Sequence, residues 1–178
     1  MFPQNIVLIG FMGTGKSSIG KRAARILGFR FVDTDHLITE RAGMEIPQIF
    51  ALHGEAHFRD LETETLRSLE NTSHQVVATG GGIVLREENR RQLRSLGFTV
   101  ALTAREDVLF ERVSRNTKRP LLQTADPQGT IHNMVQERAA LYADTAQFLV
   151  DTSDLGQQAL AELIAHEALS RFPSLTST

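Results

Sequence analysis

The sequence predicts an α/β fold of three layers, with a parallel β-sheet between two layers of helices. Short apolar or β-branched runs recur along the chain, and longer stretches with helical spacing separate them. Parallel strands need crossover connections of that length. Helices on both faces of the sheet would bury a strand as continuously apolar as the one at residues 6–9.

The apolar runs give five predicted strands, at residues 5–9, 29–32, 75–78, 99–102 and 148–150. The first strand belongs to an apolar opening segment, residues 1–12, which has no basic start and is too short to cross a bilayer. We therefore interpret that segment as a buried strand.

Helical spacing predicts five helices, at residues 16–27, 56–68, 86–95, 130–142 and 157–170. A sixth helix is predicted around Val108–Phe110, because Thr103 to Glu106 has the pattern of a capping box. Pro47 suits the first turn of a helix. Residues 116–129 hold two prolines and a glycine, and so long an irregular connection is typical of a lid.

Length and composition limit the classes of protein. The 178 residues fit one domain, expected over residues 1–172, with a fraying tail at 173–178. A net charge of −2 gives no broad attraction for nucleic acid, and no apolar run reaches membrane length. The absence of cysteine excludes disulfides, thiolate metal sites and cysteine nucleophiles. We expect a cytoplasmic monomer without a nucleic-acid or membrane partner.

Residues 10–17 match the phosphate-binding pattern G-x-x-x-x-G-K-[ST] between a predicted strand and a predicted helix. Such a turn points backbone N–H groups at phosphate oxygens, and the helix N-terminus adds partial positive charge. Lys16 is expected to reach the β- and γ-phosphates of ATP, and the Ser17 hydroxyl to bind Mg²⁺. The other expected ATP contacts in this segment are Gly13, Thr14, Gly15 and Ser18. The alternative is a chance glycine-rich turn.

Two carboxylates, Asp33 and Asp35, follow the second predicted strand at the sheet edge where ligands collect in such folds. In extended backbone they would point the same way, into the phosphate crevice. Asp33 would hold Mg²⁺ directly or through water, and Asp35 would orient an acceptor hydroxyl or take its proton. The alternative is a helix N-cap formed by Thr34 or Asp35.

Two arginines suggest an anionic acceptor, because the planar guanidinium suits bidentate recognition of a carboxylate. Arg59 stands three residues before Glu62, and Arg138 stands four before Tyr142, so each pair shares one helix face. The alternative for each pair is a solvated helix face.

Two loops are predicted to approach the ligands. Arg119, in the irregular stretch, is placed to swing over the nucleotide and neutralise charge on the phosphoryl group. Gly80, Gly81 and Gly82 follow the third predicted strand, where missing side chains would let a substrate approach the backbone. The alternative for the glycines is a flexible turn.

Two further patterns are set aside. His53 and His57 lie four residues apart but lack the order of H-E-x-x-H, so no metal site is expected there. Asp126 to Gly129 has the form of a GTPase switch motif, but the sequence contains no guanine-reading Asn-Lys-x-Asp motif.

These motifs together resemble the shikimate kinase family along nearly the whole chain. The resemblance rests on residues 10–20, on Asp-Thr-Asp at 33–35, on Gly-Glu, Phe-Arg and Glu within 54–62, on Gly-Gly-Gly at 80–82, on Arg-Pro-Leu-Leu at 119–122, and on Arg and Leu-Tyr within 138–142. It implies a five-stranded parallel sheet of P-loop NTPase type, related to nucleoside monophosphate kinases. It also implies transfer from ATP, with Mg²⁺, to the 3-hydroxyl of shikimate in aromatic amino-acid biosynthesis.

The resemblance also implies a role for single residues. It assigns Asp33 to the magnesium environment and Asp35 to the shikimate hydroxyl. It assigns the shikimate carboxylate to Arg59 and Arg138, and the lining of that pocket to the glycines at 80–82. By the same resemblance Arg119 is the lid arginine, and Arg112 stacks on the adenine.

The expected site holds MgATP on residues 10–17 and the acceptor beneath a segment at about 35–62, closed by residues 116–129. Two other functions stay open at this point. One is a P-loop kinase for another small acceptor, such as a nucleoside monophosphate or a sugar acid. The other is a nucleotide-dependent switch without turnover, against which the paired arginines and the missing guanine motif argue.

Overall fold

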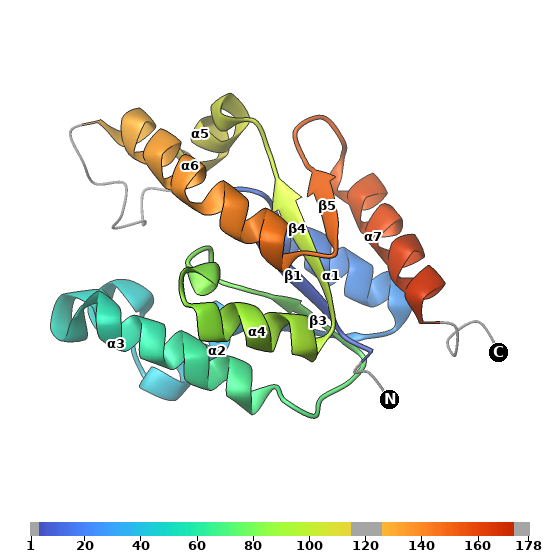
Figure 1. Cartoon of the computed structure of the whole chain (residues 1–178), viewed down its shortest axis with the longest axis horizontal. Helices are drawn as coiled ribbons and strands as arrows, with labels where there is room; N and C mark the ends of the chain where they lie inside the picture. Colours follow the sequence, from blue (N-terminus) through green and yellow to red (C-terminus); the bar gives the residue numbers. More distant parts are fainter. Residues whose placement is uncertain (1–3, 115–125, 173–178) are drawn as a thin grey trace.

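Within residues 4–114 and 126–172, which the computed structural model describes, five strands form one parallel sheet in the order β2-β3-β1-β4-β5 (Figure 1). The strands are β1 (Ile6–Gly10), β2 (Arg30–Asp33), β3 (Gln75–Ala78), β4 (Phe98–Thr103) and β5 (Phe148–Asp151). In register, Val7 lies opposite Val77 of β3 and Thr99 of β4. The central strand is β1, and its last residue, Gly10, is the first residue of the predicted phosphate loop.

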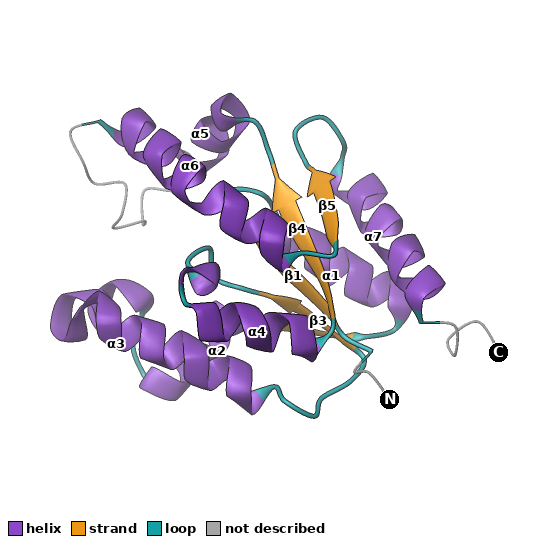
Figure 2. Cartoon of the chain, in the orientation of Figure 1, coloured by secondary structure: helices purple, strands orange, loops and turns teal. Residues whose placement is uncertain are grey.

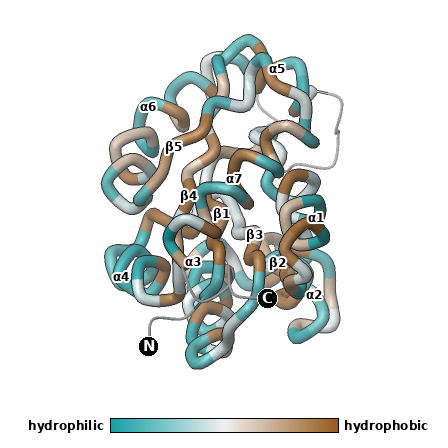
Figure 3. The backbone as a smooth tube through the Cα atoms, turned by 90° about the vertical axis from the view of Figure 1, so that its right-hand side faces the viewer, coloured by the Kyte–Doolittle hydropathy of each residue, from teal (hydrophilic) through white to brown (hydrophobic). Residues whose placement is uncertain are grey.

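The apolar residues of β1 divide the core into two halves, one on each face of the sheet. Ile6 and Leu8 pack on helices α1 (Lys16–Leu27) and α7 (Gln157–Arg171), while Val7 and Ile9 face the opposite layer. All four side chains are fully buried. Each such burial stabilises the fold by about 1.5–3 kcal/mol, which explains why β1 is apolar throughout. In Figure 3 the backbone of the central strands is coloured largely as hydrophobic.

The opposite layer contains helices α4 (Glu87–Leu96) and α6 (Pro127–Thr145), with α5 (Glu106–Ser114) beside α6. Figure 2 shows the strands between the two helical layers. None of the described helices is long and apolar enough to cross a membrane.

A smaller unit stands at the carboxyl end of β2. It consists of α2 (Thr34–Ala42) and α3 (Ile46–Ser68), and Ile38, Ile49 and Phe58 form its own apolar cluster. Helix α3 bends at Gly54, whose backbone is not helical. The half of α3 after this bend packs against α4 and the short 3₁₀ turn η1 (Ile83–Leu85).

The fold class and all five predicted strands are confirmed, with ends that move by one residue at most. The helix predicted at 16–27 is α1, and those predicted at 86–95 and 157–170 are α4 and α7 with small shifts. Pro47 does lie in the first turn of a helix, α3. That helix begins ten residues before the predicted start at residue 56, and α2 was not predicted.

Two predictions about helix starts were wrong. The capping box at Thr103 does not form, because Thr103 ends β4 and α5 begins only at Glu106. The predicted irregular segment reaches too far, because α6 begins at Pro127 and the Asp126 side chain accepts from the Gly129 N–H at 2.9 Å. Asp126 to Gly129 is thus a helix start. The rest of the predicted lid and residues 173–178 of the predicted tail lie outside the described residues.

Candidate active site

The phosphate loop connects β1 to α1 at the carboxyl edge of the sheet. Thr14 closes the turn, because its hydroxyl donates to the Phe11 carbonyl at 2.8 Å. The Lys16 ammonium is folded back over the loop and donates to the carbonyls of Gly10 at 2.7 Å and Phe11 at 2.9 Å. Lys16 is 9% exposed, so this positive charge is held inside the loop rather than in bulk water.

Ser17 and Asp33, the two residues expected near magnesium, lie in direct contact. The Ser17 hydroxyl donates to Asp33 Oδ2 at 2.7 Å. The other Asp33 oxygen accepts from the Asp35 N–H at 3.1 Å and caps α2. The prediction of an extended backbone at Asp35 was wrong, since Asp35 lies in the first turn of α2. The N-cap is Asp33 rather than Thr34 or Asp35.

Two adjoining cavities lie along the phosphate loop and share Gly13 and Gly15. One encloses about 280 Å³ and is lined by residues of the loop, by both carboxylates and by the glycine turn: Gly13, Gly15, Lys16, Ser17, Ser18, Asp33, Asp35, Thr79 and Gly81. The other encloses about 340 Å³ on the far side of the loop, toward β5 and α7. The predicted residues Lys16, Ser17, Asp33 and Asp35 therefore face one space.

Arg112, which the resemblance assigns to the adenine, borders the second cavity. It is fixed by the turn after β5, where its guanidinium donates to the Thr152 hydroxyl at 3.0 Å and to the Thr152 carbonyl at 2.7 Å. A longer contact of 3.4 Å reaches the Gly13 carbonyl. Arg112 thus braces the phosphate loop against the β5–α7 turn.

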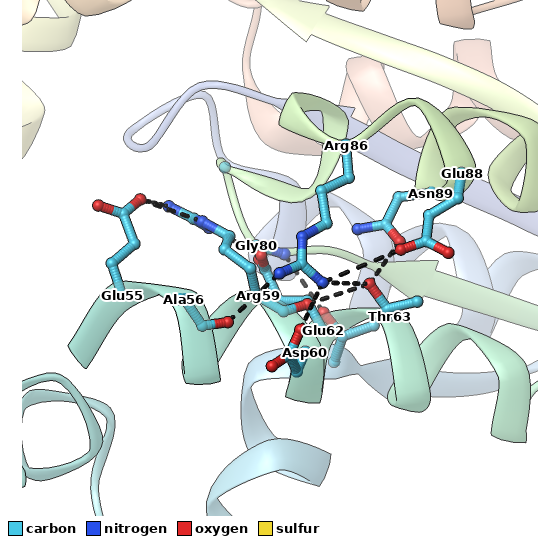
Figure 4. A network of polar contacts seen from close by, with 12 residues as sticks. Glu55, Ala56, Arg59, Asp60, Glu62, Thr63, Gly80, Arg86, Glu88 and Asn89 are labelled. Atoms are coloured by element: carbon cyan, nitrogen blue, oxygen red, sulfur yellow. Dashed lines mark hydrogen bonds and ion pairs between the residues drawn. The ribbon is translucent and has the colours of Figure 1, made fainter. Parts of the chain in front are cut away.

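Arg59 sits between two carboxylates of its own helix (Figure 4). Its Nη1 donates to Glu62 Oε2 at 2.7 Å, and its Nε and Nη2 donate to Glu55 Oε1 at 3.1 and 2.7 Å. Arg59 is 7% exposed and Glu62 is fully buried. The alternative of a solvated helix face is therefore wrong for this pair.

Arg138 is also buried, at 6% exposed, so the same alternative is wrong here. Its Nε has no hydrogen-bond partner in the described part of the protein. Its guanidinium lies 6.0 Å from the centre of the Phe11 ring, which places it beside the phosphate loop. Tyr142, one turn further along α6, donates its hydroxyl to the Gly81 carbonyl at 2.5 Å. A buried guanidinium N–H without an acceptor is costly unless a ligand supplies one.

The glycine turn at residues 80–82 is the wall that these groups share. A Cβ on Gly80 would lie 2.8 Å from both Asp35 Oδ1 and Glu62 Oε1, and a Cβ on Gly82 would overlap the Arg59 guanidinium. Side chains are excluded here by close approach. The Gly80 N–H donates to the Thr34 hydroxyl at 3.2 Å, so this N–H group is already bonded within the protein.

The electrostatics of the turn follow from burial. Desolvation raises the pKa of Glu62 to about 7, although Arg59 opposes the shift, and the nearby charge of Asp35 adds to it. Burial alone would lower the pKa of Arg59, but Glu62 and Glu55 outweigh it and the pKa is raised. Desolvation likewise raises the pKa of Tyr142 to about 12, against the effect of Arg138. Arg59 thus faces the turn as a cation.

Sequence reasoning missed two residues of this network. Glu55 lies four residues before Arg59, and that spacing was a readable signal for an ion pair. Arg86 ties α3 to the start of α4 through Asp60 at 2.8 Å and the Ala56 carbonyl at 3.3 Å (Figure 4). No local pattern marked Arg86.

Arg119 lies outside the described residues. The rings of His53 and His57, the pair set aside on sequence grounds, lie 5.0 Å apart at the bend of α3. No group of three or more potential His, Asp or Glu metal ligands occurs in residues 4–114 and 126–172. A hydroxyl paired with one carboxylate, as at Ser17 and Asp33, instead suits Mg²⁺, which keeps water and phosphate oxygens in its shell.

A phosphate loop at the central strand, a hydroxyl–carboxylate pair beside it and two buried arginines nearby are the features of a P-loop kinase. Comparison with known proteins supports this class. The family model for shikimate kinase matches residues 12–168. The chain is 48% identical over 164 residues to the shikimate kinase of Thermodesulfovibrio yellowstonii, covering 92% of this chain and 94% of that protein.

The solved structures agree. Shikimate kinase from Acinetobacter baumannii in complex with shikimate superposes with a TM-score of 0.90 at 36% identity, over 96% of this chain and 95% of that one. A gluconokinase from Sinorhizobium meliloti, 20% identical with a TM-score of 0.52, shares the fold alone. The chain belongs to the shikimate kinase family.

Proposed function

We propose that the protein transfers the γ-phosphoryl group of ATP to the 3-hydroxyl of shikimate, giving shikimate 3-phosphate and ADP in aromatic amino-acid biosynthesis. The observation that carries the acceptor assignment is the pair of buried arginines at the glycine turn. Arg138 has a buried Nε without a partner, which suits a ligand carboxylate. Shikimate carries one carboxylate, and the relative from Acinetobacter baumannii was solved with it.

ATP would bind with its phosphates on residues 10–17 and its base in the cavity beside Arg112. The phosphates would offer Lys16 oxygens in place of the carbonyls of Gly10 and Phe11, with which it now bonds. Gly13, Thr14, Gly15 and Ser18 would complete the loop contacts, and Arg119 would approach the phosphates from the lid. Neutralising the transferring phosphoryl group is the main contribution such groups make to the rate.

Mg²⁺ fits the Ser17 and Asp33 oxygens, which lie 2.7 Å apart and need little movement to share an ion. When bound there, Mg²⁺ would neutralise phosphate charge and orient the γ-phosphate. Asp35 would hold the acceptor hydroxyl and accept its proton as the new P–O bond forms and ADP leaves. The carboxylate of shikimate would bind Arg59 and Arg138, with Gly80, Gly81 and Gly82 as the wall of its pocket.

Closure of the acceptor segment, residues 35–62, and of the lid, residues 116–129, would exclude water and suppress wasteful hydrolysis of ATP. We place the reaction in the cytoplasm and expect a monomer to perform it. A kinase for a sugar acid or a nucleoside monophosphate is the competing function.

The test is a coupled assay of ADP release with MgATP, in which shikimate is compared with quinate, gluconate and nucleoside monophosphates. We expect turnover with shikimate alone. If the protein binds nucleotide but no acceptor stimulates ADP release, the assignment of the phosphate loop stands. The acceptor roles of Asp35, Arg59 and Arg138 are then overturned.

A further inference from the structure

Every nitrogen of the Arg59 guanidinium already donates to a carboxylate of the same helix. Glu55 takes Nε and Nη2 through one oxygen, at 3.1 and 2.7 Å, and Glu62 takes Nη1 at 2.7 Å. The Nε and Nη2 atoms form one of the two-pronged edges with which arginine grips a planar carboxylate. A ligand carboxylate that approaches this edge must therefore displace Glu55.

Burial decides which of the two carboxylates gives way. The Glu62 side chain is fully buried, whereas that of Glu55 is 55% exposed. Separating a buried pair leaves an uncompensated charge away from water. Glu55 can instead turn into solvent, where water replaces its partner, and exposed pairs of this kind are weak.

The backbone at this point permits the movement. Gly54, directly before Glu55, has a φ of 78°, and a Cβ there would meet nothing within 4 Å. Glycine is thus required by the bend and not by packing. Directly after Glu55 the helix is anchored, because Arg86 binds the Ala56 carbonyl and Asp60 (Figure 4). Glu55 lies at the junction between an anchored half of α3 and a bend.

We propose that Glu55 is a competitor for Arg59 built into the chain, which occupies the guanidinium until the carboxylate of the acceptor displaces it. This inference rests on the proposed function of Arg59. The exchange replaces one negative charge with another, so the pocket does not gather a further anion beside Glu62 and Asp35. A neutral acceptor has no group with which to replace Glu55 and leaves the Arg59–Glu55 pair in place, so the competition lowers affinity only for acceptors that carry a carboxylate.

The experiment measures binding of shikimate to the full chain by calorimetric titration, in the wild type, Glu55→Gln and Glu55→Ala. Removing an exposed competitor is expected to lower the Kd of shikimate by about 2- to 5-fold in both variants. The KM for shikimate should fall in parallel, while kcat and the KM for MgATP stay unchanged. An analogue with a hydroxymethyl group in place of the carboxylate should bind all three proteins equally.

Glu167→Gln is the matched control. Glu167 accepts from Arg171 Nε and Nη2 at 3.1 and 2.7 Å, the same one-turn geometry and the same distances, on α7. It should leave the Kd of shikimate at the wild-type value.

The outcomes separate the two levels of the proposal. A Kd that is unchanged or raised in Glu55→Gln, with normal binding to the wild type, overturns the competition, and a raised Kd would make Glu55 a support for Arg59 instead. An equal gain for the neutral analogue also overturns it. A wild type that binds no shikimate overturns the proposed function and this inference together.

Discussion

Replacing Arg59 with lysine should weaken acceptor binding strongly while leaving nucleotide binding intact. Arg59 has three nitrogens in fixed positions, and Nη1 is held by buried Glu62 at 2.7 Å. A lysine has one nitrogen, which Glu62 would hold, so at least one charge-assisted hydrogen bond to the acceptor is lost. Such a bond contributes about 1.5–3 kcal/mol, which corresponds to a rise of roughly 10- to 150-fold in the acceptor Kd.

The assay is steady-state ADP release with shikimate and MgATP varied in turn. The KM for shikimate should rise in Arg59→Lys, and the KM for MgATP should not. Arg67→Lys is the control, because Arg67 lies on the same helix with 57% of its side chain exposed and contacts Glu88 at 3.3 Å. An unchanged KM for shikimate in Arg59→Lys would refute the reasoning that Arg59 grips the carboxylate.

Three more substitutions test the other parts of the site. Lys16→Met should reduce kcat by about 10²-fold or more, because it removes a preorganised charge from the phosphates. Lys21→Met, on the same helix, is the control. Equal kcat values for the two variants would contradict the role of Lys16. Asp33→Asn should raise the Mg²⁺ concentration needed for half-maximal rate while leaving the free energy of unfolding close to the wild-type value, since asparagine caps a helix about as well as aspartate; an unchanged Mg²⁺ dependence would remove Asp33 from the ion's environment. Glu62 has a pKa of about 7 when folded and an ordinary value of 4.5, so between these pH values the unfolded chain binds fewer protons. The free energy of unfolding should therefore fall as pH rises through this range, by about 3 kcal/mol in total. Chemical denaturation of Glu62→Gln should show a free energy of unfolding that no longer falls over this pH range. The same pH dependence in the wild type and in Glu62→Gln would contradict the raised pKa.

The sequence predicted the sheet and the phosphate loop well because both depend on local signals. Residues 6–9 are apolar without interruption, and the loop pattern stands between a strand and a helix. Helix α2 carried no such signal. Only Thr34 and Ile38 are buried within it, so it lacks a clear apolar stripe, and Asp35 was therefore placed in extended backbone.

The buried cluster proposed as the acceptor site depends on tertiary packing that spacing cannot show. Arg59, Glu62 and Arg138 are typical of solvated helix faces when taken singly. In the fold all three are buried, with the glycine turn against Glu62 and Arg59 and with Phe11 beside Arg138. The Arg59–Glu62 pair followed from a three-residue spacing, while the equally readable pair with Glu55 was missed. Arg86 acts across elements from the start of α4, which no pattern within α3 predicts.

Product analysis tests the central claim most directly. The protein would be incubated with MgATP and shikimate, and the products followed by ³¹P NMR with detection of coupling to ring protons. The account predicts ADP and one phosphomonoester whose phosphorus couples to the proton on carbon 3 of shikimate. ADP with inorganic phosphate and no phosphomonoester, or a phosphate on another hydroxyl, would contradict it.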